Sequence, residues 1–205
     1  MAPEERFVPR FAAEPPQDLL PYGRWAQTLG DHFAAAVERI DDEGEDLGEP
    51  GELVFHPDRT WHGRTYVPMT TRTTTGLELY GYVSFTPGDD DAEPDDFEAT
   101  ADFTGETAEA NPDWRIDLCD EVVGAWRGEQ GRRAAMTLVW GRPLVDAGAL
   151  VTAELAGLVV DQCVLVEGRF TLLAPDDYRG DTLDIRLFDR RGGELAHESL
   201  YAEEE

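Results

Sequence analysis

Lysine is absent from the 205 residues of this chain, and all 17 basic side chains are arginine. Aspartate and glutamate number 44, so the formal net charge at pH 7 is −27. No basic run is longer than the pairs Arg132-Arg133 and Arg190-Arg191. Because nucleic acids and anionic membranes bind basic surfaces, the sequence predicts neither as a partner. A G+C-rich genome and a salty cytoplasm both explain this composition, since salt screens the repulsion among surface acids.

Long apolar runs and cysteines are also scarce. No segment is long enough to span a bilayer, and residues 1–18 lack the apolar core of a signal peptide. The two cysteines are Cys119 and Cys163. Without a secretion signal, such a pair is more often two core thiols than a disulfide. These absences predict a soluble, cytosolic protein.

Recognised catalytic signatures are missing as well. The sequence has no G-x-S-x-G, P-loop, G-x-G-x-x-G, H-E-x-x-H or C-x-x-C pattern. Ser84 and Ser199 lie in no nucleophile motif, and the neighbours His197 and Glu198 point to opposite faces of their predicted strand. The sequence names no reaction, and it favours a protein that is not an enzyme.

One amphipathic helix is predicted, over residues 18–40. Asp18 is its expected N-cap, and Pro21 falls in the first turn, where a missing N–H is tolerated. One apolar stripe recurs at spacings of three and four residues, which is typical of a helix that packs on one face. The stripe consists of Trp25, Leu29, Phe33, Val37 and Ile40.

The rest of the chain alternates in the manner of β-strands. Turn residues such as those of HPDR, RGEQGR and DRRGGE separate short apolar-polar segments. Many strands without intervening helices predict a mainly β fold, either an antiparallel β-barrel or a two-layer β-sandwich, with the N-terminal helix packed on it. The predicted strands are 52–56, 60–69, 76–86, 96–105, 113–119, 121–127, 132–140, 149–155, 158–166, 168–174, 182–189 and 194–201.

The length of the chain fits a single domain. Residues 1–17 are proline-rich and are expected to be extended. Residues 18–205 form the predicted β-rich domain, in which an acidic linker, 41–52, joins the helix to the strands. The acidic segment 86–98 is predicted to be an exposed loop, because it offers no apolar surface to bury.

Two of the four histidines lie in the segment 54-VFHPDRTWHGRTYVP-68. Pro57-Asp58 favours a type I turn, so the segment is predicted to be a hairpin. An odd-length loop would place His56 and His62 across from each other, close enough to bind one metal ion with Asp58, and an even-length loop would not. Zinc sites need three or four ligands, and we favour surface or cross-strand histidines over a metal site of His56, Asp58 and His62.

Two acidic segments resemble calcium loops only loosely. Residues 41–52 place acids at calcium-loop positions, but Asp46 replaces the required glycine. The aspartate-rich segment 88–96 could bind calcium weakly, although a solvated run of charge is the more common arrangement. No cofactor is predicted, and weak binding of a divalent metal is left open.

Aromatic side chains give the best functional lead. In residues 77–85, Tyr80 and Tyr82 share one strand face with Glu78 and Ser84, and the apolar side chains take the other face. A face of aromatic and polar groups can line a ligand cavity, or it can be covered by the helix or by stacked arginines. The candidate ligand-binding residues are Trp61, Tyr66, Tyr80, Tyr82, Trp114, Trp126 and Trp140.

Three functions remain open from the sequence. The leading hypothesis is a non-catalytic protein that binds a small, partly apolar ligand in an aromatic-lined cavity. The second is an interaction or assembly module whose aromatic and arginine faces dock a protein or a second copy, so a homo-oligomer is possible. The third is a metal-assisted hydrolase or isomerase that uses His56, Asp58 and His62.

Overall fold

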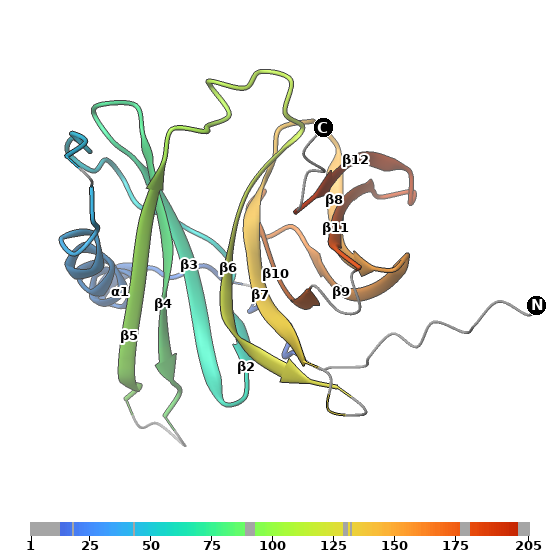
Figure 1. Cartoon of the computed structure of the whole chain (residues 1–205), viewed down its shortest axis with the longest axis horizontal. Helices are drawn as coiled ribbons and strands as arrows, with labels where there is room; N and C mark the ends of the chain where they lie inside the picture. The colour runs from blue at the N-terminus through green and yellow to red at the C-terminus, as the bar shows by residue number, and fades with distance from the viewer. Residues whose placement is uncertain are drawn as a thin grey trace, which may run out of the picture.

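The computed structural model describes residues 13–200, apart from 18, 43, 89–92, 129–130, 132 and 177–180. Its layers are a helix, a first sheet, a middle sheet and an outer sheet, which lie side by side in Figure 1. A separate apolar cluster fills each of the three spaces between neighbouring layers. All three sheets are antiparallel.

The helix α1 (Gly23–Val37) covers the outer face of the first sheet. The whole predicted stripe packs there, with Leu29 and Phe33 fully buried. The helix begins later than predicted: its N-cap, Tyr22, is extended, and Pro21 disfavours a helical conformation of the residue before it. Asp18, its expected N-cap, lies outside the described residues. The strands of this sheet are β1 (Val54–Phe55), β2 (Arg59–Trp61), β3 (Arg64–Arg72), β4 (Glu78–Thr86) and β5 (Asp95–Thr104).

The middle sheet is buried on both faces. Its strands are β6 (Ile116–Arg127), β7 (Arg133–Pro143) and β10 (Phe170–Asp176), in the order β10-β7-β6. Every residue of β10 is buried, and so is the centre of β7. Side chains of β7 alternate between the two neighbouring layers: Leu138 and Trp140 face the first sheet, and Val139 faces the outer sheet. The middle sheet therefore contributes to two cores.

The outer sheet closes the other side of the molecule. Its strands are β8 (Gly148–Leu155), β9 (Leu158–Val164), β11 (Leu183–Asp189) and β12 (Glu194–Ser199), in the order β12-β11-β8-β9. The predicted hairpin at Gly192-Gly193 joins β11 to β12. Leu183, Ile185 and Leu187 alternate toward the middle sheet, as the period of two predicts.

The predicted fold class is confirmed: the protein is mainly β and sandwich-like, with one N-terminal helix in the described part of the chain. The sheets in these described residues do not close into a barrel. A third sheet adds a layer to the predicted two. Its signal is the continuous apolar runs of β7 and β10, which are typical of strands buried on both faces.

Three further local predictions were wrong. The hairpin turn lies at His62-Gly63 and not at Pro57-Asp58, because β2 pairs Trp61 directly with Arg64 of β3. Both turn residues have positive φ, as a two-residue hairpin turn requires. The predicted strands 113–119 and 121–127 are one strand with a bulge, and β5 already begins at Asp95, inside the predicted loop. Within the described residues, no helix has the length and apolarity needed to cross a lipid bilayer.

Candidate functional site

A cavity of about 250 Å³ lies between the first and middle sheets. Strands β1, β3 and β4 form one wall, and β6 and β7 form the other. The connection from β5 to β6 arches over this end of the two sheets in Figure 1 and adds Glu109 to the lining. Asn111 shapes the connection: its backbone N–H donates to the Thr107 carbonyl (3.0 Å), and its carbonyl accepts from Trp114 N–H (3.1 Å). The cavity thus has a structured cover.

The space between the first and middle sheets is polar at the cavity and apolar deeper inside, and strand alternation explains which side chains point into it. Glu78 begins β4 on the same face as Tyr80 and Tyr82, so all three side chains point toward the middle sheet. Deeper between the sheets, the aromatic and aliphatic side chains pack into a core. Charged residues replace them where the strands end. The polar end of the same interlayer space therefore forms the cavity.

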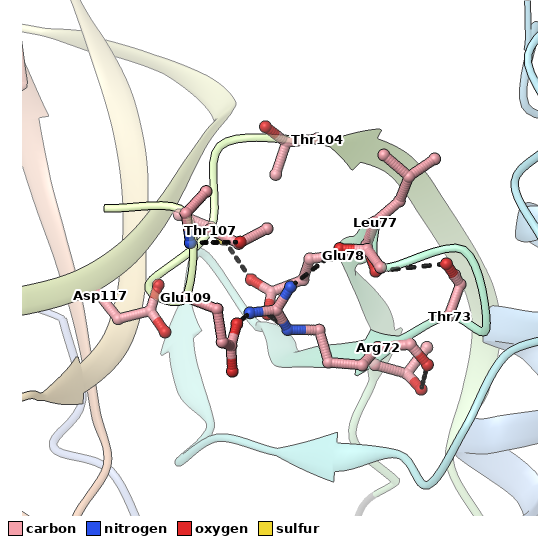
Figure 2. Close-up of polar contacts among 12 residues, drawn as sticks. Arg72, Thr73, Leu77, Glu78, Thr104, Thr107, Glu109 and Asp117 are labelled. Carbon is pink, nitrogen blue, oxygen red and sulfur yellow. Dashed lines mark hydrogen bonds and ion pairs between the residues drawn. The ribbon is translucent and has the colours of Figure 1, made fainter. Parts of the chain in front are cut away.

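Arg72 pairs with two carboxylates, of which only Glu109 belongs to the cover. Its Nε lies 3.4 Å from Glu78 Oε2, and its Nη2 forms an ion pair with Glu109. Figure 2 shows the Arg72 guanidinium between these two carboxylates, while Asp117 points toward the group from β6. The Glu109 side chain is largely exposed, so its ion pair contributes little to stability. Its role is to tie the cover to β3.

Glu78 and Asp117 form a buried pair of acids in this cavity. Burial raises the pKa of Glu78, and the charge of Asp117 raises it further, while Arg72 and Arg142 lower it. Asp117 is itself held by Arg142, whose Nε and Nη2 both lie 3.1 Å from Asp117 Oδ2. Glu78 therefore takes up a proton more readily than an exposed glutamate. Such a pair can donate hydrogen bonds to a ligand and accept hydrogen bonds from it, and can exchange protons with it.

His56 also lines the cavity, where the charges of Arg169 and Arg142 act on its ring. It is 3% exposed, and its backbone N–H donates to the Pro68 carbonyl (2.9 Å). Burial, with the charges of Arg169 and Arg142, lowers the pKa of its ring to about 3. The Gly141 carbonyl faces the ring and acts in the opposite sense, but neither ring nitrogen has a described partner at hydrogen-bond geometry. At neutral pH His56 is an uncharged, unsatisfied polar group.

Trp140 and Cys119 complete the wall on the side of the middle sheet. Trp140 is fully buried, and its indole Nε1 has no hydrogen-bond partner among the described residues. The Cys119 Sγ lies 3.9 Å from Glu78 Oε1. Burial raises the pKa of this thiol well above its usual value, with the Glu78 charge adding to the effect. The thiol is therefore protonated at neutral pH and is a poor nucleophile.

Most of the predicted aromatic residues do come together. Tyr66 and Tyr82 contact edge to face, with ring centroids 5.6 Å apart, and Tyr80 lies 6.4 Å from Trp140. They fill the space between the two sheets, and of the predicted set only Trp140 lines the cavity. Trp114 is not part of this cluster; it lies in the connection before β6 and lines a neighbouring groove with Tyr80. The residues of the cluster are Trp61, Tyr66, Tyr80, Tyr82, Trp126 and Trp140.

The structure separates His56, Asp58 and His62. His56 faces the cavity, whereas Asp58 accepts a hydrogen bond from the Gln17 N–H (3.0 Å) at a different groove. His62 lies in the hairpin turn, with its ring 4.5 Å from that of Trp61. Across the residues that the structure describes, no group of three or more His, Cys, Asp or Glu side chains could hold a metal ion. Residues 43 and 89–92 of the two acidic segments lie outside those residues.

Comparison of the chain with protein-family models, with curated proteins and with solved structures finds no match. Function is therefore inferred from the chemistry of the cavity alone.

Sequence reasoning found His56 but missed the charged residues around it. Arg72 ends β3 and Glu78 begins β4, while Asp117 and Arg142 lie opposite each other near the ends of β6 and β7. Arg169 comes directly before β10. Their shared signal is a charged side chain at the end of an apolar strand. That signal marks a site only once the stacking of the sheets is known.

Gly141 is expected to tolerate no side chain. A Cβ there would lie 2.0 Å from the Asp117 carbonyl oxygen and 2.8 Å from Leu118 Cα, so β6 and β7 would have to separate. We expect Gly141→Ala to lower the free energy of unfolding by about 1–3 kcal/mol, measured by denaturant titration. Gly105→Ala is the control, because its Cβ would meet only Leu77 Cδ2 at 3.7 Å. Equal stability of the two variants would contradict this close approach.

Proposed function

We propose that this protein is a cytosolic, non-catalytic binding protein that holds a small polar molecule in the cavity between the first and middle sheets. The observation that carries the proposal is the His56 ring, which is buried in the wall and faces the Gly141 carbonyl, but has no partner at hydrogen-bond geometry among the described residues. An unsatisfied buried polar group costs about 1–3 kcal/mol. A ligand or an ordered water in the cavity would offset this cost.

The size and lining of the cavity limit the ligand. Its volume of about 250 Å³ is just below the usual range for drug-sized ligands, so it suits a small metabolite. Arginine, acidic and threonine side chains supply polar contacts, while Trp140, Leu118 and Val54 supply a limited apolar surface. A small molecule that is mainly polar, with a short apolar part, matches this wall better than a largely apolar ligand does.

Assembly through an exposed face has less support. Leu158, Val159 and Val164 on β9 are at least half exposed, and β9 is an edge strand of the outer sheet. Such a patch can dock a partner, but a second copy would also bring its own net charge of −27 against the first. The cavity, with its buried unsatisfied groups, remains the stronger candidate.

Filling the cavity is expected to remove the ligand. Thr70 lines the cavity and is only partly buried, so Thr70→Phe should occupy the space without deep repacking. We expect native mass spectrometry of protein purified without chelator to show a co-purified small molecule on the wild type and none on Thr70→Phe. Thr86→Phe, at the exposed end of β4, is the matched control and should keep the molecule. An empty wild-type protein, or a molecule that Thr70→Phe retains, would refute binding at this cavity.

A further inference from the structure

We infer that the molecule held in the cavity carries an oxyanion, a carboxylate or a phosphate, which binds Arg169 and Arg142 at the end of the cavity beside His56. This inference rests on the proposed function, and it names the chemical class of the ligand.

The three arginines of the cavity are not equally neutralised. Arg72 meets two carboxylates, and Arg142 meets one, although 49% of its side chain is exposed. Arg169 has no carboxylate partner among the described residues; its Nη1 donates to the Phe55 carbonyl (2.9 Å). That hydrogen bond anchors Arg169 next to His56 and leaves its charge unpaired. The lining thus has as many arginines as carboxylates, but two carboxylates share Arg72, so Arg169 is left without an ion pair among the described residues.

The pKa of His56 shows that the charges of the arginines reach the lining of the cavity. The charged groups that act on its ring are Arg169, before β10, and Arg142, on β7, and both oppose its protonation. The Asp117 carboxylate, which lines the same cavity, is already bound to Arg142. A positive potential at this point attracts an anion. Both ring nitrogens of His56 lack a described partner, so a ligand that reaches the ring can bond to it, and a nearby anion also acts on the ring through its charge.

The hydrogen-bond donors and acceptors of the cavity lining also favour an anion. The carboxylates of Glu78, Glu109 and Asp117 already accept from arginines. A guanidinium has five N–H donors, and Arg169 uses one nitrogen on Phe55. The indole N–H of Trp140 is a further donor without a described partner. A ligand group that only accepts hydrogen bonds fits this surplus, and oxyanions bind guanidinium groups through paired, charge-assisted hydrogen bonds.

The test uses small probes and the ring of His56 as the reporter. Acetate, inorganic phosphate and the neutral analogue acetamide are titrated into the full chain, and the ring resonances of His56 are followed by NMR after assignment with His56→Phe. We expect acetate or phosphate to shift the His56 resonances saturably and to raise the pKa of the ring, since a nearby anion favours its protonated form. The tighter of the two anions identifies the headgroup. Acetamide should cause no saturable shift.

Variants locate the anion. Arg169→Gln is expected to weaken binding of the anion at least tenfold, and Arg169→Lys, which keeps the charge and guards against loss of folding, to weaken it less. Arg115→Gln, at an exposed arginine before β6, should bind as the wild type does. Binding of acetamide as tight as that of acetate, or undiminished binding of the anion by Arg169→Gln, would overturn the inference. A co-purified neutral molecule that Thr70→Phe removes would overturn it too, while leaving the proposed function intact.

Discussion

Replacing Arg59 by methionine is expected to lower the free energy of unfolding by about 3–5 kcal/mol, because it leaves a largely buried carboxylate without its partner. Arg59 is 1% exposed and forms an ion pair with Asp161, which joins β2 of the first sheet to β9 of the outer sheet. The same carboxylate accepts a hydrogen bond from Leu173 N–H of β10 (2.8 Å). Burial raises the pKa of Asp161, and the charge of Arg59 opposes that rise. One side-chain pair thus connects all three sheets.

Denaturant unfolding at pH 7.5 measures this effect, with Arg64→Met as the matched control. Arg64, like Arg59, forms ion pairs. Its two partners are Asp96 (2.7 Å) and Glu98 (3.0 Å), and the side chains of these acids are 67% and 70% exposed. Exposed ion pairs contribute at most about 1 kcal/mol, so the control should lose far less stability. Similar losses in the two variants would show that the Arg59–Asp161 pair has no special role in joining the sheets.

Acidification is expected to destabilise the wild type through His56, and His56→Phe should abolish this part of the pH dependence. The pKa of the ring is 6.5 in the unfolded chain and about 3 in the folded one. Between these values only the unfolded state takes up the proton, so stability is lost as pH falls below 6.5. Each pH unit costs about 1.4 kcal/mol, which gives about 2 kcal/mol at pH 5. At pH 7.5, loss of an unsatisfied polar group should leave His56→Phe at least as stable as the wild type.

The measurement is the free energy of unfolding at pH 7.5 and 5.0 for both proteins. Acids whose pKa is raised in the folded state, among them Glu78 and Asp161, gain stability on acidification in both proteins, so the difference between the proteins isolates His56. His32→Phe repeats the ring replacement at a partly exposed site on the helix. Parallel pH profiles of wild type and His56→Phe would refute the uncharged state of the buried ring.

The fold was largely predictable from local chemistry. Alternation in 183–189 and the glycines at 192–193 specify β11, its turn and β12, and the structure contains all three. The turn at His62-Gly63 was missed because Pro57-Asp58 has the stronger local turn propensity. Pairing of β1 and β2 with the same strand, β3, overrides that propensity. The third layer was missed because apolar runs such as that of β10 do not say what covers their second face.

The site was less predictable than the fold. His56 was found because histidines are few, but its neighbours Arg142 and Arg169 come from the middle sheet and meet it only after two sheets stack. The aromatic residues of β4 were correctly placed on one face, yet a facing sheet fills most of the space that they could have lined. The space between two sheets stays open in some places and is filled in others. The difference depends on how long the strands of both sheets are and where they end. A single strand does not carry that information.

The path of the chain through the sheets bears on how the molecule opens. Strand β10 belongs to the middle sheet but lies in sequence between β9 and β11 of the outer sheet. We therefore expect the middle and outer sheets to unfold together. Residues 23–104, by contrast, build the helix and first sheet from one continuous segment. Native proteins open in such cooperative units, which differ in hydrogen-exchange protection. The cavity has one wall in each unit, so an occupant would join them, and slower amide exchange in β3 and β4 would report that it is bound.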